Sequence, residues 1–422
     1  MMGNSMAMSR QRGDSTSLKA ATLDGARVIV VLTELEMGGA ERQALLLSRY
    51  LAHEENAKVQ IWGLGRQPGR VAEACEESGI PWRLVAQQWF GSRGERMKGL
   101  ARLAFALRRA RADIVLPYLI LPNVVCGLVW RWAGARVCVW NQRDGSFTRL
   151  GPRAERCAVR QTPWFVSNSA HGAAFLTQTL RAPPERVRII NNGVQLAPPQ
   201  ADRATWRSRL GIDTDTVAAC MIANLTRYKD HETLLRAWRR VVRSLQETGR
   251  SAVLLLAGRL DSSDSTHHAS KALAYDLELG RSIRFLGEVQ DVSGLLGAAD
   301  LGVFSSRAES SPNGVLESMA AGLALAATDI PGVREAVGPG GYEFLAPPGD
   351  DGALADRILR LVAEPSLRAE LGAANRLRIE SEFSPRRMCE QTAAVIIEGL
   401  RGKTSAARKA RGALGTEAGG VL

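Results

Sequence analysis

The sequence has few of the residues that build metal sites and disulfide frameworks. Its 422 residues include six cysteines, none in a C-x-x-C pair, and five histidines, of which only His267 and His268 are adjacent. Zinc sites need Cys and His ligands at short, fixed spacings, and disulfide-stabilised domains need many cysteines in a short chain. We therefore expect no metal site in this protein. We also expect its cysteines to be free, as in a reducing cytoplasm.

Long apolar runs and a secretory signal are also missing. The most apolar stretch, residues 114–140, is interrupted by prolines and arginines, whereas a membrane-spanning helix needs about 20 consecutive apolar residues. This stretch predicts a buried strand and a core helix. Residues 1–26 are polar and Ser-rich without an apolar core segment, which predicts a disordered N-terminal extension and a cytoplasmic protein.

Acidic residues are scarce in the first half of the chain. Residues 1–200 contain 27 Lys and Arg against 15 Asp and Glu, whereas residues 201–400 contain 23 against 27. A basic half can bind nucleic acid, an anionic membrane or an anionic acceptor. The basic residues do not alternate with stacking aromatics, so we expect no nucleic-acid partner. The basic segment 94–111, with Met97 and Leu100 at helical spacing, fits either an interfacial helix or an ordinary surface helix.

The chain is long enough for two domains, and strands alternate with helices in both halves. This alternation predicts an α/β fold with two Rossmann-like doubly wound domains that face a cleft. The predicted strands are residues 27–33, 58–64, 114–116, 136–140, 164–167, 216–223, 253–257, 283–286 and 301–304. The predicted domains are residues 27–195 and residues 203–385, followed by a helix at 386–401 that crosses back to the first domain and a basic flexible tail at 402–422.

The most informative segment is Glu309-Ser-Ser-Pro-Asn-Gly-Val-Leu-Glu317, which follows a predicted buried strand. Residues 318–327 predict a packed helix, with Ser310 or Ser311 as its N-cap. A helix start leaves backbone N–H groups unpaired and attracts anions, so a phosphate fits between the two carboxylates. Each carboxylate could then accept hydroxyl protons. The alternative is a capped helix with two solvated glutamates.

Two further loops follow strands and carry groups suited to phosphate. Gly38-Gly39 opens a helix and lets a ligand approach the backbone, although an ordinary turn is the alternative. Arg227 and Lys229 offer a planar fork and a point charge to phosphate, unless they form a solvated loop pair. A G-x-G-x-x-G fingerprint is missing at the first loop, so no nicotinamide cofactor is indicated.

In this order, these segments resemble the retaining, nucleotide-sugar-dependent glycosyltransferases of glycosyltransferase family 4, which have the two-Rossmann GT-B architecture. The resemblance covers most of residues 27–400, and it implies that 27–195 is the acceptor-side domain and 203–385 the nucleotide-sugar donor domain. Its motifs are Gly38-Gly-Ala-Glu-Arg, Val166-Ser-Asn-Ser-Ala, Arg186-Val-Arg-Ile-Ile-Asn-Asn-Gly-Val, Ala223-Asn-Leu, Lys229-Asp-His, Phe285-Leu-Gly-Glu-Val, Asp291-Val and the pair Glu309 and Glu317.

The resemblance implies a role for each matching residue. Glu317 holds the nucleotide ribose hydroxyls, and Glu309 holds hydroxyls of the donor sugar. The leaving diphosphate is neutralised by Arg227 and Lys229, which with Glu309 form the predicted catalytic set. The remaining donor-binding groups are the glycines Gly38 and Gly39 and the backbone of Asn313, Gly314, Val315 and Leu316. The family also implies a metal-independent hexosyl transfer with retained configuration, and no cofactor beyond the nucleotide-diphosphate sugar.

The chain departs from the family pattern at three places. The family commonly has an Arg earlier than Arg227, where Asn224 and Thr226 stand here, and Arg227 is the expected substitute. A family His after the fourth strand is missing, and Tyr118 is the nearest polar residue. A family G-x-G is replaced by Gly258-Arg-Leu-Asp. The acceptor-side candidates are Tyr118, Arg143 and Asp144.

The expected activity is transfer of a sugar to a hydroxyl of a glycan or lipid-linked acceptor in surface polysaccharide or glycolipid biosynthesis. The expected location is cytoplasmic, with peripheral attachment to the anionic inner face of the cell membrane as a hypothesis from the charge distribution. Two alternatives stay open from the sequence. They are a nucleotide-sugar epimerase of the same architecture and a non-catalytic nucleotide-sugar-binding protein.

Overall fold

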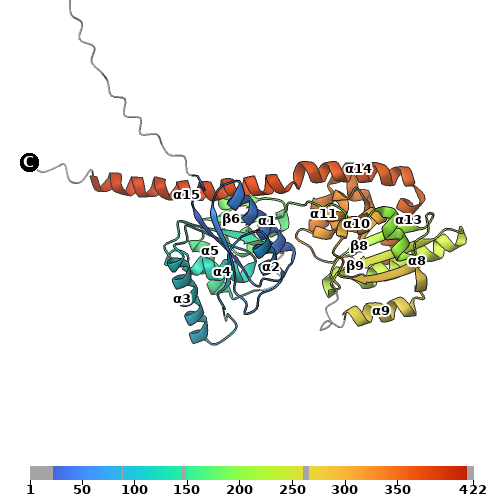
Figure 1. Cartoon of the computed structure of the whole chain (residues 1–422), viewed down its shortest axis with the longest axis horizontal. Helices are drawn as coiled ribbons and strands as arrows, with labels where there is room; N and C mark the ends of the chain where they lie inside the picture. The colour runs from blue at the N-terminus through green and yellow to red at the C-terminus, as the bar shows by residue number, and fades with distance from the viewer. Residues whose placement is uncertain (1–21, 88, 144–148, 260–265, 416–422) are drawn as a thin grey trace, which may run out of the picture.

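The computed structural model describes residues 22–87, 89–143, 149–259 and 266–415, with side chains up to residue 401. The described residues form two parallel sheets, each covered by helices, that lie next to one another along the long axis (Figure 1). The predicted α/β class with two Rossmann-like domains is confirmed. None of the described helices has an apolar run long enough to cross a bilayer.

The first sheet has the strand order β3-β2-β1-β4-β5-β6-β7 within the described residues. Its strands are β1 (Arg27–Leu32), β2 (Lys58–Gly63), β3 (Trp82–Leu84), β4 (Ile114–Pro117), β5 (Val137–Gln142), β6 (Trp164–Ser167) and β7 (Val187–Ile189). Side chains alternate between the two faces, so Val28 and Val30 of β1 pack in one core cluster while Ile29 and Val31 pack in the other. This explains why β1 is apolar throughout.

Each face of the first sheet has its own helical layer. One face is covered by α1 (Gly39–His53), α2 (Arg70–Glu77) and α15 (Pro385–Gly415). The other is covered by α3 (Arg93–Arg109), α4 (Ile120–Val129) and α5 (Pro152–Gln161). A short helix, α6 (Ala170–Ala174), follows β6.

The second sheet has the order β10-β9-β8-β11-β12-β13 within the described residues. Its strands are β8 (Val217–Ile222), β9 (Ala252–Ala257), β10 (Ile283–Gly287), β11 (Leu301–Phe304), β12 (Ala324–Thr328) and β13 (Leu345–Ala346). Its helices are α7 (Arg203–Leu210), α8 (His231–Glu247), α9 (Thr266–Asp276), α10 (Val292–Ala298), α11 (Asn313–Ala320), α12 (Pro331–Val337), α13 (Asp351–Ala363) and α14 (Pro365–Glu382). Shorter helical turns are η1 (Phe175–Thr179) and η2 (Pro184–Arg186) in the first domain. Those in the second domain are η3 (Arg227–Lys229), η4 (Gly280–Ser282) and η5 (Pro339–Phe344).

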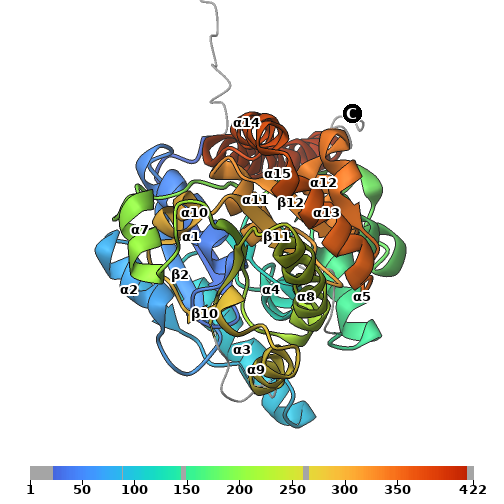
Figure 2. The same cartoon turned by 90° about the vertical axis from the view of Figure 1, so that its right-hand side faces the viewer.

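The chain crosses between the two sheets twice, and the crossings touch, since the Val194 N–H donates to the Phe383 carbonyl at 2.8 Å. Residues 191–202 contain no regular element, and α15 returns to pack against α1 with Met388 and Ile396 in the first core. Gln43 of α1 bonds both ways to the backbone of Gly193, at 2.9 and 3.0 Å. Helices α14 and α15 therefore run along the same side of both domains (Figures 1 and 2).

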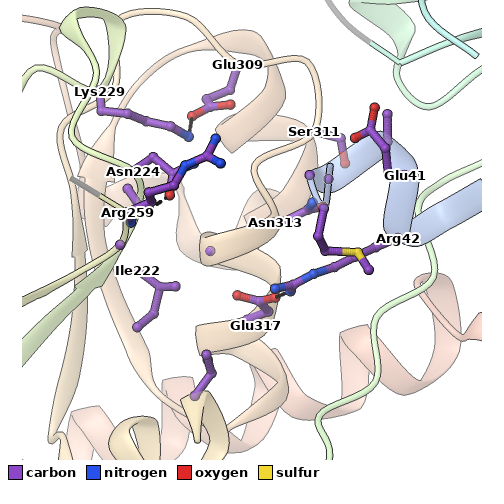
Figure 3. A pocket seen from close by; sticks show the side chains of 18 of the residues that line it. Glu41, Arg42, Ile222, Asn224, Lys229, Arg259, Glu309, Ser311, Asn313 and Glu317 are labelled. Carbon is purple, nitrogen blue, oxygen red and sulfur yellow. Dashed lines mark hydrogen bonds and ion pairs between the residues drawn. The ribbon is translucent and has the colours of Figure 1, made fainter. Parts of the chain in front are cut away.

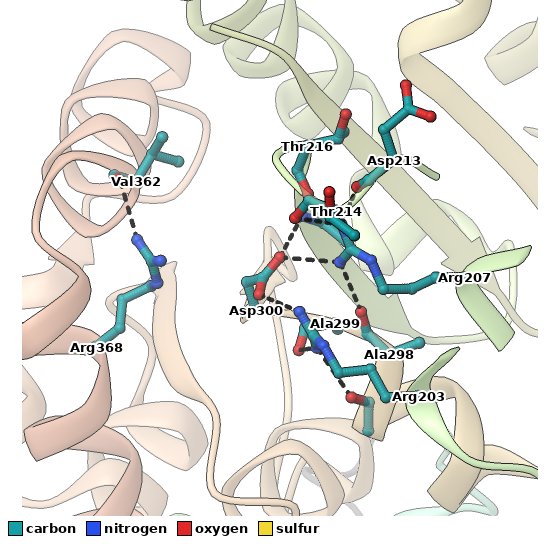
Figure 4. Close-up of polar contacts among 12 residues, drawn as sticks. Arg203, Arg207, Asp213, Thr214, Thr216, Ala298, Ala299, Asp300, Val362 and Arg368 are labelled. Carbon is teal, nitrogen blue, oxygen red and sulfur yellow. Dashed lines mark hydrogen bonds and ion pairs between the residues drawn. The ribbon is translucent and has the colours of Figure 1, made fainter. Parts of the chain in front are cut away.

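An ionic network anchors α7, the first helix after the crossing. Asp300, just before β11, accepts from Arg203 at 2.6 Å, from Arg207 at 3.4 Å and from the Ala218 N–H at 2.7 Å (Figure 4). The buried Arg207 also donates to the backbone carbonyl of Thr216 at 2.5 Å. Because a buried charge is costly when unpaired, this network fixes α7 against the second sheet.

The helix predicted at residues 318–327 is confirmed for residues 318–320 and wrong beyond them. Helix α11 ends at Ala320, Gly322 adopts a left-handed conformation (φ +77°), and Ala324–Thr328 form β12 beside β11. A short apolar run fits a buried strand as well as a helix, and here pairing with β11 decides.

The predicted Ser caps are also wrong, because Pro312 is the N-cap of α11. The Ser310 hydroxyl is instead 2.7 Å from the Ser169 hydroxyl of the first domain.

Both chain ends differ in part from the prediction. Leu23 is fully buried in the first core, so residues 22–26 belong to the folded part, and residues 1–21 lie outside the described residues. Helix α15 continues through Gly415, where a flexible tail was expected. The short edge strands β3, β7 and β13 were not predicted.

Candidate active site

A cavity of about 480 Å³ lies between the two domains, at the carboxyl ends of the strands. Its walls come from the loops after β1, β8, β9 and β11 and from the start of α11. Loops at this edge place side chains from several strands around one space, which is where ligands bind in doubly wound folds. Among its lining residues are Gly39, Lys229, Arg259, Glu309 and Glu317 (Figure 3).

Lys229 and Glu309 form an ion pair in this cavity, and both side chains are largely buried. Lys229 ends the short turn η3, and Glu309 follows β11 on the facing loop. The Ser306 hydroxyl also donates to Glu309 Oε1, at 3.1 Å. Two donors therefore hold the carboxylate in one place, and one of them carries a positive charge that a bound diphosphate would also attract.

Glu317 pairs across the domain boundary with Arg42 of α1, whose Nη1 is 2.8 Å from Glu317 Oε1. Burial raises the pKa of Glu317, and the positive charges of Arg42 and Lys229 oppose that rise. The carboxylate lies one turn inside α11 and faces the cavity (Figure 3). Its oxygens can therefore accept hydrogen bonds from a ligand in this cavity.

Two helix starts meet at the cavity, one from each domain. Helix α1 begins at Gly39, where an added Cβ would lie 2.4 Å from Nδ2 of Asn313, the first residue of α11. An added Cβ at Gly314 would lie 2.0 Å from the Ile222 carbonyl oxygen. Glycine at both positions lets the backbones approach closely. Because each helix start presents unpaired N–H groups, their convergence favours an anion such as phosphate.

The other predicted donor-binding residues differ in placement. Gly38 is the N-cap of α1 and lines the cavity, as do Asn313 and Gly314. Val315 and Leu316 are fully buried in the core of the second domain and are not among the lining residues. Their side chains therefore anchor α11, and any contact with a ligand would come from their backbone.

Arg227 is not where the sequence predicted it. It lines a separate cavity of about 570 Å³, beside His231 and Arg307, and not the cavity of Lys229. The reason is the turn between them: η3 is a 3₁₀ turn with three residues per turn, so side chains two positions apart project in different directions.

The acceptor-side candidates also differ in where the structure places them. Arg143 lines the cavity and bonds to Asn192 at 3.1 Å and to Asn141 at 3.3 Å. Tyr118 is fully buried in the first core, with Arg143 over its ring at 5.1 Å, and it does not line the cavity. Its backbone pairs with Asn141, so Tyr118 continues the alternation of β4 and its side chain joins those of Ile114 and Leu116 in the same core. Asp144 lies outside the described residues.

Comparison with known proteins identifies the family. The family model for glycosyl transferases group 1 matches residues 202–378, and the model for Glycosyltransferase Family 4 matches residues 37–197. The chain is a family 4 glycosyltransferase. The two matches together follow the two domains described above, and its fold is GT-B.

Relatives and solved structures agree with this assignment. The glycosyltransferase is 23% identical to N-acetyl-alpha-D-glucosaminyl L-malate synthase of Bacillus anthracis, over 71% of this chain and 78% of that protein. It is 30% identical to D-inositol 3-phosphate glycosyltransferase of Saccharomonospora viridis, over 55% of each. Anabaena Alr3699/HepE, solved with UDP and glucose, has the same fold, with a TM-score of 0.76 and 19% identity over 88% of this chain and 99% of that chain.

Two arginines of the glycosyltransferase's cavity were missed by sequence reasoning. Arg42 is the last residue of the Gly38-Gly-Ala-Glu-Arg motif and lies one turn into the helix that this motif opens. That position could have identified it as a residue of the site. Arg259 follows β9 directly after Gly258, and its side chain extends toward Lys229 and Glu309 (Figure 3). A cation after a strand's carboxyl end was the signal there. Arg259 forms no ion pair with any described residue.

Proposed function

We propose that this glycosyltransferase moves a hexosyl group from a nucleotide-diphosphate sugar to a hydroxyl of a glycan or lipid-linked acceptor, with retained anomeric configuration. One observation carries the proposal. The starts of α1 and α11, the cations Lys229 and Arg259 and the carboxylates Glu309 and Glu317 all line a single cavity between the domains. That set complements the phosphate, ribose and sugar parts of such a donor.

In the proposed complex, Glu317 accepts hydrogen bonds from the ribose hydroxyls, since it lies within α11 and is held by Arg42. The diphosphate lies at the starts of α1 and α11, near Gly39 and Asn313. Glu309 accepts hydroxyl protons of the sugar, next to its partner Lys229. Each part of the donor then has a group of matching polarity.

The reaction breaks the bond between the anomeric carbon and the phosphate oxygen and forms a bond from that carbon to the acceptor oxygen on the same face. The acceptor proton passes to the departing phosphate oxygen, so the products are the glycoside and a nucleoside diphosphate. Charge accumulates on the departing diphosphate, and Lys229 and Arg259 are the cations placed to stabilise it. Because these side chains supply that charge, we propose that transfer needs no metal ion.

We propose that the acceptor approaches along the first domain, where Arg143 lines the cavity. The basic surface of that domain suits an anionic acceptor. Such acceptors are intermediates in surface polysaccharide and glycolipid synthesis, which is the proposed biological role.

A ligand screen followed by a transfer assay tests the proposal. Nucleotide sugars are first screened by thermal shift, because a ligand at 100 times its Kd stabilises the folded state by about 2.7 kcal/mol. The best donor is then incubated with hydroxyl acceptors with and without EDTA, and the anomeric coupling of the product is read by NMR. The expected result is one strong donor and EDTA-resistant transfer with retention.

Each other result removes a defined part of the proposal. Donor conversion without an acceptor would indicate an epimerase. Donor binding without transfer, and no loss of binding in Glu309→Ala, would indicate a binding protein. An inverted product would contradict the same-face reaction. No thermal shift with any donor would contradict the nucleotide-sugar assignment as a whole.

A further inference from the structure

Large apolar side chains are exposed along the length of helix α3 in the first domain. Phe90, Met97, Phe105 and Trp132 are exposed by 80%, 54%, 66% and 70%, respectively. Single exposed apolar residues are normal on soluble proteins, but grouped ones mark an interaction surface. Three of these four are in or just before α3, and the fourth follows α4, which packs against α3.

Helix α3 carries apolar side chains on two opposite sides. Its buried residues Leu103, Ala106 and Leu107 face the core, as in any covering helix. At 100° per residue, Met97 and Phe105 project from the opposite side, which should be polar in a helix that faces only water. The Arg108 guanidinium bonds to the Trp132 carbonyl oxygen at 3.4 Å, so Trp132 lies beside this exposed side.

Cations flank the apolar side chains. Lys98, Arg102, Arg108 and Arg109 are exposed on the same half of α3. Neighbouring exposed cations are Arg111, Arg131 and Arg136. Within the part of the chain that the structure describes, none of the cations on α3 pairs with a carboxylate. The only acid of the helix, Glu95, is used in the capping box with Ser92.

We propose that this α3 surface, formed by Phe90, Met97, Lys98, Arg102, Phe105, Arg108, Arg109 and Trp132, binds the surface of an anionic lipid bilayer. Aromatic rings insert at the level of the lipid headgroups, while arginines and lysines around them contact the phosphates. The surface lies at the side of the first domain away from the second domain (Figure 1), so binding leaves the domain boundary free. Charge complementarity favours a membrane because the cations surround apolar side chains and are not spread over a polar groove.

The test is vesicle co-sedimentation of the full chain. Vesicles of phosphatidylethanolamine and phosphatidylglycerol are compared with neutral phosphatidylcholine vesicles. We expect binding to the anionic vesicles that weakens as salt rises, and little to the neutral ones. Each cation near the lipid contributes about five-fold to partitioning, so the variant Lys98→Ala/Arg102→Ala/Arg109→Ala should bind about 100-fold more weakly.

The exposed apolar side chains of the α3 surface are tested by a separate variant and by tryptophan fluorescence. Phe105→Ser/Trp132→Ser keeps all cations and should also lose most of the binding. Brominated phosphatidylglycerol should quench tryptophan fluorescence of the wild type more than that of Trp132→Phe. The matched control is Lys271→Ala/Tyr275→Ser on α9, because Tyr275 is 85% exposed but lies in the other domain. This control should bind as the wild type does.

Four results would overturn the proposal. The first is no preference for anionic over neutral vesicles, and the second is an equal loss of vesicle binding in the control and the α3 variants. The third is equal binding of dextran sulfate by the wild type and by Phe105→Ser/Trp132→Ser. The fourth is a wild-type dimer that the Phe105→Ser/Trp132→Ser variant converts to a monomer. The last two would assign the surface to a soluble polyanion and to a second copy of the chain. Unchanged circular dichroism and unchanged donor binding show that each variant is folded.

Discussion

Replacing Arg259 by alanine should weaken donor use strongly, and replacing Arg227 should not. Both are arginines close to Lys229, but only Arg259 lines its cavity. A hydrogen bond to a charged group is worth about 1.5–3 kcal/mol, which corresponds to about a 10- to 150-fold fall in kcat/KM for Arg259→Ala. Arg227→Ala should change kcat/KM by less than about two-fold.

The loop that carries Arg259 should stay in place in this variant, because backbone groups hold it. The Arg259 N–H donates to the Asn224 side chain at 2.9 Å, and the Arg259 carbonyl accepts from the Leu225 N–H at 3.2 Å. The Gly258 N–H donates to the Gly287 carbonyl at 2.8 Å. Alanine at 259 keeps all three bonds, so the loss reports the missing guanidinium. Asn224→Ala, which removes one bond, should give a smaller loss.

The assay is release of nucleoside diphosphate at fixed acceptor, with calorimetric binding of the nucleoside diphosphate and monophosphate. Arg259→Ala should weaken diphosphate binding far more than monophosphate binding, and Arg259→Lys should recover part of it. Equal losses for the two nucleotides would refute a role at the departing phosphate. So would an Arg227→Ala variant as impaired as Arg259→Ala.

Three further predictions concern one residue each. Glu317→Ala should weaken nucleoside diphosphate binding by about 10- to 150-fold, while inorganic pyrophosphate binding changes little, because the lost bonds go to ribose. Asp300→Ala should lower the free energy of unfolding in urea by about 2–4 kcal/mol, because the buried Arg207 loses its carboxylate. His231 is almost fully buried, and burial together with the charge of Lys229 lowers its pKa from 6.5 to about 4. Between those values the unfolded state binds more protons, so stability falls as pH falls, by about 2 kcal/mol at pH 5, and His231→Gln should remove this part of the pH dependence.

Each of these three has a control within the chain. Glu288→Ala tests whether removing any carboxylate of the cavity weakens nucleoside diphosphate binding. A loss of binding equal to that of Glu317→Ala would contradict the assignment of Glu317 to the ribose. Glu232→Ala removes an exposed partner of Arg236 and should cost less than about 0.5 kcal/mol, unlike Asp300→Ala. For His231, unfolding is followed from pH 8 to pH 5, and an identical pH dependence in wild type and His231→Gln would contradict burial of a neutral imidazole.

Much of this architecture could be read from the sequence, because local patterns carry it. Apolar strands alternating with helices determine parallel sheets, and the carboxyl ends of such strands share one edge. Residues placed after strands, such as Lys229, Glu309 and Gly39, therefore meet at one cavity. The ordered motifs also identified the family, which the two matching family models confirm.

Tertiary structure alone decided the direction of individual side chains. Arg227 and Lys229 are two residues apart, yet the turn η3 sends them to different cavities. Arg42 reaches Glu317 only because the two domains meet, and Tyr118 is buried because it continues the core-facing side of β4. Local sequence determines most of the elements and the edge that their loops occupy, whereas β12 forms because it pairs with β11. Which charged groups share the cavity depends on packing between segments that are distant in the chain.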